Sequence, residues 1–429
     1  MKWILEGGRV IDPASHWDGI QNLYISGGKI VGRGGECPEG FVANKVISAE
    51  GKWILPGLVD LSARLREPGY EYLATLESEM EAASAGGVTA LCCPPDTNPP
   101  LDEPGLVEML VHRASNQQRS HVYPIGALTE QLKGQCLTEM GELSEAGCVS
   151  FSQANCPLID TQVLMRSLQY AGTFGFSVWL YPQDFYLSQG GVAHDGEVAT
   201  RLGLSGIPVS AEVIAIQTII TLMQKIKVKV HLCRLSTADG VALVRQAQLD
   251  GMTLTCDISV QHLHLTEHDV GYFNTHCRLI PPLRTLRDRD ALRTGLREGV
   301  IQAVVSDHAP LDGDVKQLPF AKAKVGASAL ELLLPLVVQW AEQENMPLLT
   351  AIQKVTTGPA QVMGLDLGRL TVGSSADLCV FDPTCEWSVT SQSLVSQGKN
   401  TPFLNTCLQG RVIHTWFGGR LIYSLEQPS

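Results

Sequence analysis

The chain has 429 residues, of which 44% are hydrophobic and 18% are charged, enough for one large domain with room for a smaller one. Its formal charge of −12 at pH 7 comes without a block of like charges, which argues against a nucleic-acid surface or a basic membrane surface. Twelve cysteines are scattered without a C-x-x-C pair, so we expect reduced and mostly buried thiols rather than disulfides or a zinc knuckle.

The N-terminal stretch MKWILEGGRVIDP turns polar after three apolar residues and lacks the apolar segment of a signal peptide. No apolar run approaches the roughly 18–20 residues that a membrane span needs, so we expect a soluble, cytoplasmic protein. Residues 1–55 contain short apolar stretches separated by Gly pairs and by Asp or Asn turns. This pattern is typical of short β-strands.

From about residue 56 the pattern changes to apolar stretches that alternate with amphipathic helical ones. Such alternation is typical of a parallel sheet covered by helices, and eight strands predict a closed (β/α)8 barrel of TIM type over residues 56–364. The predicted strands cover 57–65, 88–95, 121–128, 148–152, 176–182, 229–236, 252–259 and 301–310. The predicted helices between them cover 72–87, 105–118, 161–175, 210–227, 238–251 and 287–299.

After two further helical stretches, the chain returns to short strands such as GRLTVG and ADLCVFD within residues 365–429. Both ends of the chain are therefore rich in short strands, while the middle predicts the barrel. The simplest arrangement pairs residues 1–55 with residues 365–429 in one small β-sandwich domain beside the barrel.

Functional groups of such a barrel belong at the C-terminal ends of its strands. The first strand ends in Ser62, Arg64 and Arg66, and the last ends in Asp307 and His308 of SDHAP. A catalytic zinc needs imidazole and carboxylate ligands, whereas guanidinium groups are always protonated and never serve as ligands. The strand ends therefore do not offer an ordinary metal site.

Five segments in a fixed order resemble dihydroorotase of the long bacterial type, a cyclic amidohydrolase. PGLVDLSARLREPG is similar to the family's metal-ligand strand, AGGVTALCCPPDTNP to its asparagine loop, and IPPLR to a segment before the last barrel helix. SDHAP is similar to the last metal-ligand strand, and ADLCVFDP with GKNTPF to the C-terminal sandwich. The resemblance runs nearly from end to end and implies a barrel with a sandwich of the amidohydrolase type.

Most of the family's metal ligands are replaced when this resemblance is followed residue by residue. The family's histidines and its bridging acidic ligand fall on Ser62, Arg64, Gln153, Tyr181 and Arg234. Only the eighth-strand aspartate is kept, as Asp307, which in the family binds metal and acts as the general base. The resemblance therefore implies a vestigial Asp307, no catalytic residue, and no zinc or other cofactor.

Part of the family's substrate-contact pattern is kept. Arg66 and Asn98 match the residues that hold the substrate carboxylate, and His308 follows Asp307 as it does in the family, but Ile280 replaces a family asparagine. Two structural interpretations stay open beside these roles. Arg66 is alternatively an arginine that pairs with a nearby acid, and Asn98 is alternatively a turn residue between prolines.

A buried Asp307 without a metal would be an unpaired charge, which is costly. We therefore predict that Arg64, Arg234 or both reach into the vacated space and donate charge-assisted hydrogen bonds to Asp307.

Four other histidines are interpreted without a metal. His262 and His264 form an H-x-H pattern, but the family carries a similar segment that it does not use for metal, so we prefer a structural or surface role. His231 lies inside an apolar strand, so we expect it to be a core histidine with satisfied hydrogen bonds. His194 lies in the polar stretch GGVAHDGE and is expected to be solvated.

Proteins that resemble this chain and lack the metal histidines serve in some bacteria as the non-catalytic subunit of aspartate transcarbamoylase, commonly in a dodecamer of six chains of each kind. The resemblance implies a pseudoenzyme of pyrimidine biosynthesis that supports its partner's catalytic trimers, with a homodimer as its expected unit. One alternative is a working hydrolase with a rearranged site around Asp307, His308 and the seventh-strand histidines. Another is a sensor of pyrimidine precursors that uses Arg66 and Asn98.

Overall fold

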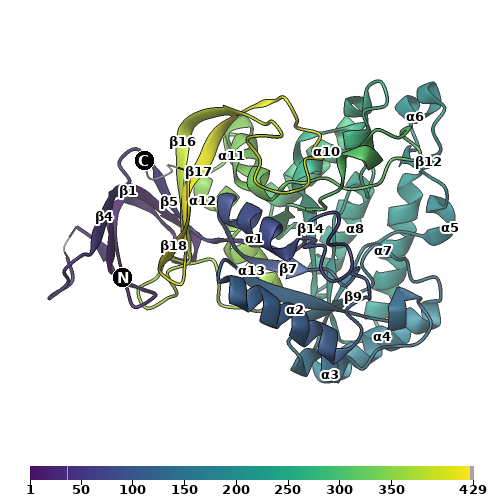
Figure 1. Cartoon of the computed structure of the whole chain (residues 1–429). Coiled ribbons are helices and arrows are strands. Elements are labelled where there is room, and N and C mark those ends of the chain that lie inside the picture. The colour runs from purple at the N-terminus through teal and green to yellow at the C-terminus, as the bar shows by residue number, and fades with distance from the viewer. Residues whose placement is uncertain (36, 426–429) are drawn as a thin grey trace.

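The computed structural model describes residues 1–35 and 37–425, and one of its two eight-stranded sheets holds parallel strands in chain order (Figure 1). The strands are β6 (Leu58–Asp60), β7 (Val88–Cys93), β8 (His121–Ala127), β9 (Ser150–Ser152), β10 (Ser177–Leu180), β13 (Lys229–Leu232), β14 (Leu254–Ser259) and β15 (Ala303–Val305). All eight lie where the apolar stretches predicted them. Most of their residues are buried, because a parallel sheet of this kind is covered on both faces.

The sheet closes just beyond the ends of its first and last strands. His308 forms a parallel bridge with Ala63, and its backbone N–H donates to the carbonyl oxygen of Ser62 at 3.1 Å. The N–H of Arg64 in turn donates to the carbonyl oxygen of His308 at 2.9 Å. The predicted (β/α)8 barrel is therefore confirmed, and its closure brings the segment after β6 against the segment after β15.

Helices surround the barrel mostly at the positions that the helical stretches predicted, although the helix Met140–Glu145 was not predicted. The barrel helices are α1 (Leu76–Ala85), α2 (Pro104–Gln117), α3 (Met140–Glu145), α4 (Thr161–Phe174), α7 (Val209–Met223), α8 (Ala238–Leu249) and α10 (Leu286–Arg297), followed by α11 (Leu333–Gln343), α12 (Leu348–Gln353) and α13 (Thr357–Met363). Three of them begin after Thr75, Thr237 and Thr285, whose side-chain oxygens each accept a hydrogen bond from the backbone N–H three residues later. These caps satisfy backbone donors that a helix start leaves free.

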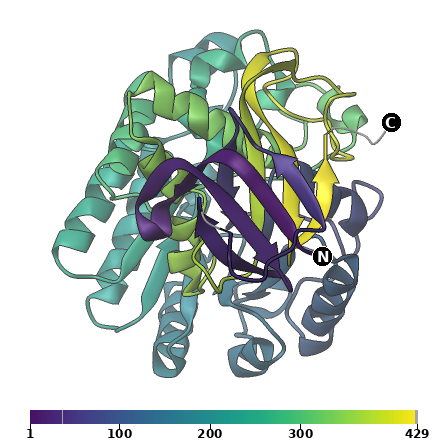
Figure 2. The same ribbon diagram turned by 90° about the vertical axis from the view of Figure 1, so that its left-hand side faces the viewer.

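The two ends of the chain form a second, β-rich domain, as predicted. Its strands are β1 (Trp3–Asp12), β2 (Trp17–Ser26), β3 (Lys29–Gly34), β4 (Lys45–Ser48), β5 (Trp53–Pro56), β16 (Leu378–Ser388), β17 (Cys407–Phe417) and β18 (Arg420–Ser424). They are joined in the order β18-β17-β16-β5-β1-β2-β3, with β4 also paired to β1, so one hydrogen-bonded sheet contains both ends. Figure 2 shows the purple N-terminal strands beside the yellow C-terminal ones.

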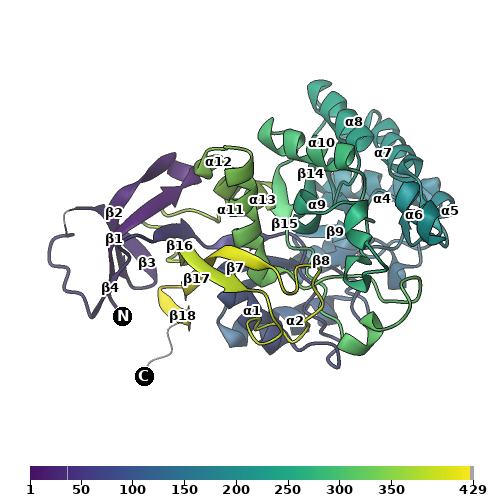
Figure 3. The ribbon, with the colours of Figure 1, turned by 90° about the horizontal axis from the view of Figure 1, so that it is seen from above.

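The second domain packs against the barrel helices through several of its strands, among them β16 and β17. Phe381 and Val412 belong to the same apolar cluster as the barrel helices, and Thr415 donates to the carbonyl oxygen of Ser84 in α1 at 2.7 Å. The outer part of the domain has its own core, in which Trp3 meets Trp416 edge to face at 5.8 Å. Figure 3 shows β16 and β17 against the barrel and the β1–β4 part extending away from it.

Several short elements have no counterpart in the sequence prediction. Two-residue strands β11 (Ala193–His194) and β12 (Gly206–Ile207) pair with each other between β10 and α7, near the short helices α5 (Phe185–Ser188) and α6 (Glu197–Leu202). A further short helix, α9 (Val260–His264), follows β14. Elements this short carry too few residues for a periodic apolar signal.

Two expectations from composition can be compared with the structure. All twelve cysteines are free, as expected, but only six are buried, so the expectation of mostly buried thiols was too strong. Within residues 1–35 and 37–425, no helix combines the length and the apolar content needed to cross a bilayer.

Candidate functional site

The charged residues at the strand ends gather around a cavity of about 120 Å³ at the C-terminal end of the barrel. Its lining combines side chains that follow β6, β7, β9, β13 and β15, because the C-terminal ends of parallel strands meet at one end of a barrel. The lining residues are Arg64, Arg66, Asp96, Asn155, Arg234, Ile280, Asp307, Ala309, Val325 and Gly326.

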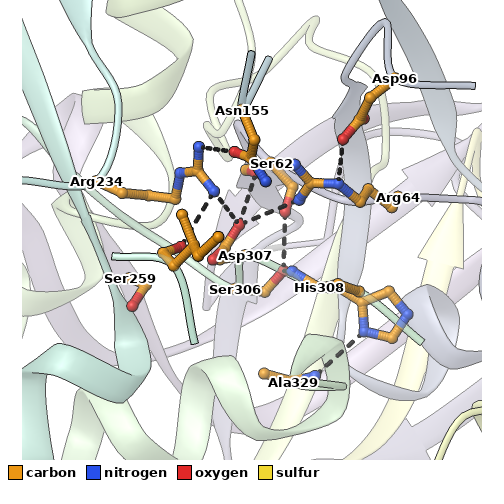
Figure 4. Close-up of polar contacts among 12 residues, drawn as sticks. Ser62, Arg64, Asp96, Asn155, Arg234, Ser259, Ser306, Asp307, His308 and Ala329 are labelled. Atoms are coloured by element: carbon orange, nitrogen blue, oxygen red, sulfur yellow. Dashed lines mark hydrogen bonds and ion pairs between the residues drawn. The ribbon is translucent and has the colours of Figure 1, made fainter. Parts of the chain in front are cut away.

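Asp307 lies at the centre of this site and is held by two arginines (Figure 4). Its Oδ1 atom is 3.3 Å from Nη1 of Arg64 and 3.1 Å from Nη1 of Arg234, and the hydroxyl of Ser62 donates to the same oxygen at 3.4 Å. The predicted pairing is therefore confirmed for both arginines. Their guanidinium groups are buried and supply positive charge to a carboxylate that is itself only 14% exposed.

Arg64 joins Asp307 to a second carboxylate. Its Nε donates to Oδ2 of Asp96 at 2.8 Å, while its Nη1 points at Asp307 (Figure 4). Burial opposes charge on Arg64, but Asp96 and Asp307 outweigh burial and raise the pKa of Arg64. Burial likewise opposes charge on Asp96, but Arg64 outweighs it and lowers the pKa of Asp96. Arg64 and Asp96 therefore stay ionised, and Arg64 links the two carboxylates.

Arg234 is fixed from three further sides. Its Nη2 donates to Oδ1 of Asn155 at 2.6 Å, and its Nη1 also approaches the carbonyl oxygen of Ile280 at 3.4 Å. The guanidinium carbon lies 4.8 Å from the ring centre of Tyr181, a cation–π contact. Arg234 is only 4% exposed, so its position is set by these contacts.

The cavity does not fit the catalytic zinc that the barrel type would accommodate. Three of its lining side chains are guanidiniums, which cannot be metal ligands. Of the oxygen atoms in the lining that could bind a metal, Oδ2 of Asp96, Oδ1 of Asp307 and Oδ1 of Asn155 each already accept a hydrogen bond from an arginine. A zinc ion here would have to displace two buried cations, and we derive no metal-dependent step at this site.

The two other degenerate ligand positions lie beside the cavity rather than in it. Gln153 exchanges hydrogen bonds with Thr129, at 2.8 and 3.0 Å, and the hydroxyl of Tyr181 donates to Gln183. Both Gln153 and Tyr181 line a separate cleft of about 180 Å³ next to α4 and α7. Burial raises the pKa of Tyr181, so its hydroxyl is neutral.

Of the three expected substrate contacts, only Arg66 lines the cavity. Its Nε donates to the carbonyl oxygen of Pro310 at 2.9 Å, and no ion pair to Arg66 is found within residues 1–35 and 37–425. Asn98 is exposed and lies outside the lining, with its backbone N–H bonded to Pro68 at 3.0 Å. The turn interpretation of Asn98 therefore fits the structure, and the pairing of Arg66 with an acid does not.

The expected substrate contact of His308 is not supported. Figure 4 shows its ring directed away from Asp307 and toward Ala329, whose N–H donates to Nδ1 at 3.1 Å. The other ring nitrogen is 2.6 Å from Oε2 of Glu79, and the side chain is fully buried. Because both ring nitrogens have protein partners, His308 ties α1 to the last strand instead of facing a ligand.

The remaining histidines are structural. His262 contacts Ser259 at 2.7 Å and the carbonyl of Pro282 at 3.2 Å, and His264 contacts the carbonyl of Leu336 at 2.9 Å. Burial lowers the pKa of both His262 and His264 to about 4. These contacts support the structural interpretation over a relocated metal site.

The expectation that His194 is solvated was wrong. It was expected to be solvated because its neighbours in the sequence are polar, yet it is 6% exposed and lies in β11. Its Nδ1 is 3.0 Å from Nη1 of Arg284, an arginine that also bonds the carbonyl of Ile207. Arg284 lies 90 residues away in the sequence, so the local polarity around His194 could not reveal this burial.

His231 is a fully buried core histidine, as predicted. Its ring nitrogens lie 2.8 Å from Thr255 and 2.8 Å from Asp257. With Cys233 and Asp257 it also forms a group of three potential ligand atoms within 4.8 Å of one another. Asp257 is further engaged by the backbone N–H of Arg234 at 2.7 Å, so these groups already satisfy each other.

Sequence interpretation missed two residues that complete the site, Asp96 and Asn155. A signal was present for each, since Asp96 follows directly after the predicted strand 88–95 and Asn155 lies three residues after β9. Neither corresponds to a ligand position of the family, so following the resemblance alone could not find them.

Comparison with known proteins shows the family to which the chain belongs. Residues 51–240 match the model described as dihydro-orotase-like, and residues 225–423 match a model of the amidohydrolase family. A dihydroorotase-like protein of Pseudomonas aeruginosa is 43% identical over 419 residues, covering 98% of this chain and 99% of that protein. The chain belongs to the dihydroorotase-like proteins of the amidohydrolase superfamily. A protein named dihydroorotase from Geobacter sp. (strain M21) is 36% identical over 425 residues, covering 99% of each chain.

Solved structures agree with this fold. An L-hydantoinase (dihydropyrimidinase) from Arthrobacter aurescens has a TM-score of 0.88 at 22% identity, covering 99% of this chain and 96% of that one. A dihydropyrimidinase from Brevibacillus agri NCHU1002 has a TM-score of 0.83 at 21% identity, covering 100% and 96%. At this level of identity the similarity supports the fold and not the activity.

Proposed function

We propose that this member of the family is a non-catalytic dihydroorotase homologue that scaffolds aspartate transcarbamoylase in cytoplasmic pyrimidine biosynthesis. The observation that carries the proposal is Asp307, which lies 3.3 Å from Arg64 and 3.1 Å from Arg234. In an active amidohydrolase this carboxylate would serve a metal and its bound water. Here its charge is already met by two buried guanidiniums, while the barrel around it is intact.

A barrel kept whole around such a site is consistent with a role in assembly. The proposed unit is a homodimer of this chain, and the proposed complex is a dodecamer of six chains with six aspartate transcarbamoylase chains. The partner's stability or activity would then depend on binding to this pseudoenzyme and not on chemistry in its barrel.

Size-exclusion chromatography with multi-angle light scattering tests the proposal directly. The purified chain is run alone, then mixed with aspartate transcarbamoylase from the same organism, and transcarbamoylase activity is measured across the peaks. We expect a co-eluting high-mass complex with activity that the partner alone lacks or loses. Separate elution, with partner activity independent of this chain, would refute the scaffold role.

A second candidate is an active amidohydrolase with a rearranged site. Relatives that are 35–37% identical over nearly the whole chain carry the name dihydroorotase, and His231, Cys233 and Asp257 form a potential ligand group. Zinc analysis combined with a dihydroorotase assay separates the candidates. Stoichiometric zinc together with turnover would favour the hydrolase. A protein that holds no zinc and shows no turnover would favour the scaffold.

A further inference from the structure

Three exposed apolar side chains gather at the cleft next to α4 and α7. Ile159, Tyr186 and Ile214 all line this cleft, and they are 51%, 71% and 46% exposed. Single exposed apolar residues are common on protein surfaces, but several around one hollow indicate a surface that binds a partner. The helices α5 and α7 lie at the end of the molecule away from the second domain (Figure 1).

The exposed side of α7 carries no charge. The residues of this helix that are exposed recur every three or four positions, which places them on one side of it: Ser210, Ile214, Gln217 and Thr221. The only charged residue of α7, Glu212, is buried and accepts hydrogen bonds within the barrel. A helix on the surface of a globular protein normally turns charged residues to water, so this side of α7 is suited to contact with protein.

The short helix α5 extends the uncharged surface. The backbone N–H of Asp184, just before α5, donates to the carbonyl oxygen of Ala211 in α7 at 2.9 Å and so ties the two helices together. Residues 185–194 contain no Asp, Glu, Lys or Arg, although 18% of the chain is charged. Asp160 and Asp184, which adjoin this surface in the sequence, each cap the start of a helix. The exposed residues of α5 and α7, together with Ile159, are called the α5–α7 face below.

Charge indicates which partner the α5–α7 face suits. The chain has a formal charge of −12, so two copies of it repel each other in most orientations. A surface without charged side chains is where two copies can meet without placing like charges against each other. Recognition of a different protein commonly uses complementary charges, which this face does not offer. The face therefore suits a second copy of the chain.

The shape of the face is also self-complementary. Tyr186 is 71% exposed on α5 and stands beside the cleft, whose walls include Leu158 and Ile214. A two-fold pair uses the same surface on both chains, so a projecting ring next to a hollow lets each copy fill the hollow of the other. Tyrosine is common in such contacts because its ring is apolar while its hydroxyl can still form a hydrogen bond.

We propose that a second copy of this chain docks on the α5–α7 face about a two-fold axis, with Tyr186 of each protomer inserted into the cleft of its partner. This contact surface belongs to the homodimer of the proposed function, so the inference rests on that unit but not on the binding of transcarbamoylase. The dimer would leave the second domain, at the other end of each chain, free to meet the catalytic trimers.

Sedimentation equilibrium of the purified full chain, without transcarbamoylase, tests the proposal. At micromolar concentration we expect the mass of two chains of 46.4 kDa each. Ile214→Glu places a charge in the face and Tyr186→Ala removes the inserted ring, and each should weaken dimerisation roughly tenfold or more. Ile20→Glu is the matched control, because Ile20 is 77% exposed on β2 at the opposite end of the molecule (Figure 3). All three side chains are exposed, so the variants should fold as the wild type does, which circular dichroism checks.

The outcomes separate this inference from the scaffold proposal. A dimer that dissociates in both face variants but not in Ile20→Glu would support it. A single chain at every soluble concentration, or dimers of unchanged strength in both face variants, would overturn it. An effect of Ile214→Glu without one of Tyr186→Ala would overturn the insertion of the tyrosine ring. None of these results involves transcarbamoylase, so the scaffold proposal keeps its own separate test.

Discussion

The guanidinium of Arg234 lies 3.1 Å from the carboxylate of Asp307, across the C-terminal end of the barrel. These two residues follow β13 and β15, and the family resemblance assigns metal ligands to both positions. One position has kept its carboxylate and the other has gained a cation. The pair therefore shows how an arginine can supply positive charge to an aspartate that the barrel has kept.

The first prediction concerns the energy of this pair. We expect Arg234→Met to destabilise the protein by about 3 kcal/mol, because removing one partner leaves the other charge poorly compensated in a buried site. Asp307→Asn in the Arg234→Met background should cost less than in the wild type. A double-mutant cycle by chemical denaturation should give a coupling energy of about 0.5–3 kcal/mol.

An exposed ion pair provides the control for this cycle. Arg245 and Glu298 are paired at the surface, with about half of each side chain exposed. Arg245→Met should change the unfolding free energy by less than about 1 kcal/mol. Equal effects of Arg234→Met and Arg245→Met would show that the buried network does not stabilise the barrel.

The second prediction concerns substitutions that would restore metal ligands at the barrel end. Ser62→His, Arg64→His and Arg234→His together remove two cations and place three imidazoles near Asp307, a donor set that suits zinc. The folded triple variant should bind about one zinc per chain by equilibrium dialysis. The matched variant with alanine at the same three positions should not, and equal zinc in both variants would contradict the prediction.

The third prediction concerns the anchor of His308. Glu79 is fully buried and accepts from Ser396, Gln397 and Ser78 while contacting His308. Glu79→Gln should destabilise the protein by about 2–3 kcal/mol. The NH2 group of the glutamine side chain would face hydroxyl and N–H donors that now donate to a carboxylate oxygen, so these donors would lose an acceptor.

Glu81 lies on the same helix but is exposed, and it forms an ion pair with Arg119 at the surface. Glu81→Gln should therefore change stability by less than about 0.5 kcal/mol in the same denaturation experiment. Similar effects of the two substitutions would mean that the Glu79 cluster contributes no more than a surface pair.

The fourth prediction is a pH dependence from Lys316, which lies in the loop after the last barrel strand. Its Nζ donates to the carbonyls of Thr275 and Arg278, and burial, followed by the charge of Arg278, lowers the pKa of Lys316 from 10.5 to about 7. Between these pH values the unfolded chain binds more protons than the folded one, so this contribution to stability rises with pH. From pH 7 to pH 9 it should rise by about 2 kcal/mol.

Unfolding free energies of the wild type and Lys316→Met at both pH values isolate this contribution. The difference between the two proteins should grow in favour of the wild type as the pH rises. Lys322→Met serves as control because Lys322 is exposed in the same loop. A difference that is constant with pH would show that Lys316 titrates normally in the folded protein.

Much of the fold could be predicted because its signal is local. Each buried strand of the barrel is a short apolar run, and helices such as α4 show both an apolar face and a capping residue, Asp160. Strand ends converge in a barrel, so Arg64, Arg234 and Asp307 could be placed together before any coordinates. The pairing of both arginines with Asp307 then followed from the cost of a buried charge.

Other parts of the site depend on contacts that sequence does not encode locally. His194 has polar neighbours in the sequence, but in the structure it is buried and contacts Arg284, which lies 90 residues away. His308 follows Asp307 in the chain, yet the left-handed backbone of Asp307 and the partner Glu79 direct its ring away from the cavity. Arg66 forms no ion pair within residues 1–35 and 37–425, and this depends on where residues distant in the sequence come to lie.

Dihydroorotase turnover of the purified chain supplied with zinc tests the central claim most directly. The arginine-filled site predicts no turnover above a protein-free control at any zinc concentration that keeps the chain folded. Turnover that depends on zinc and disappears in Asp307→Asn would contradict the account, because Asp307 would then serve a metal instead of two arginines.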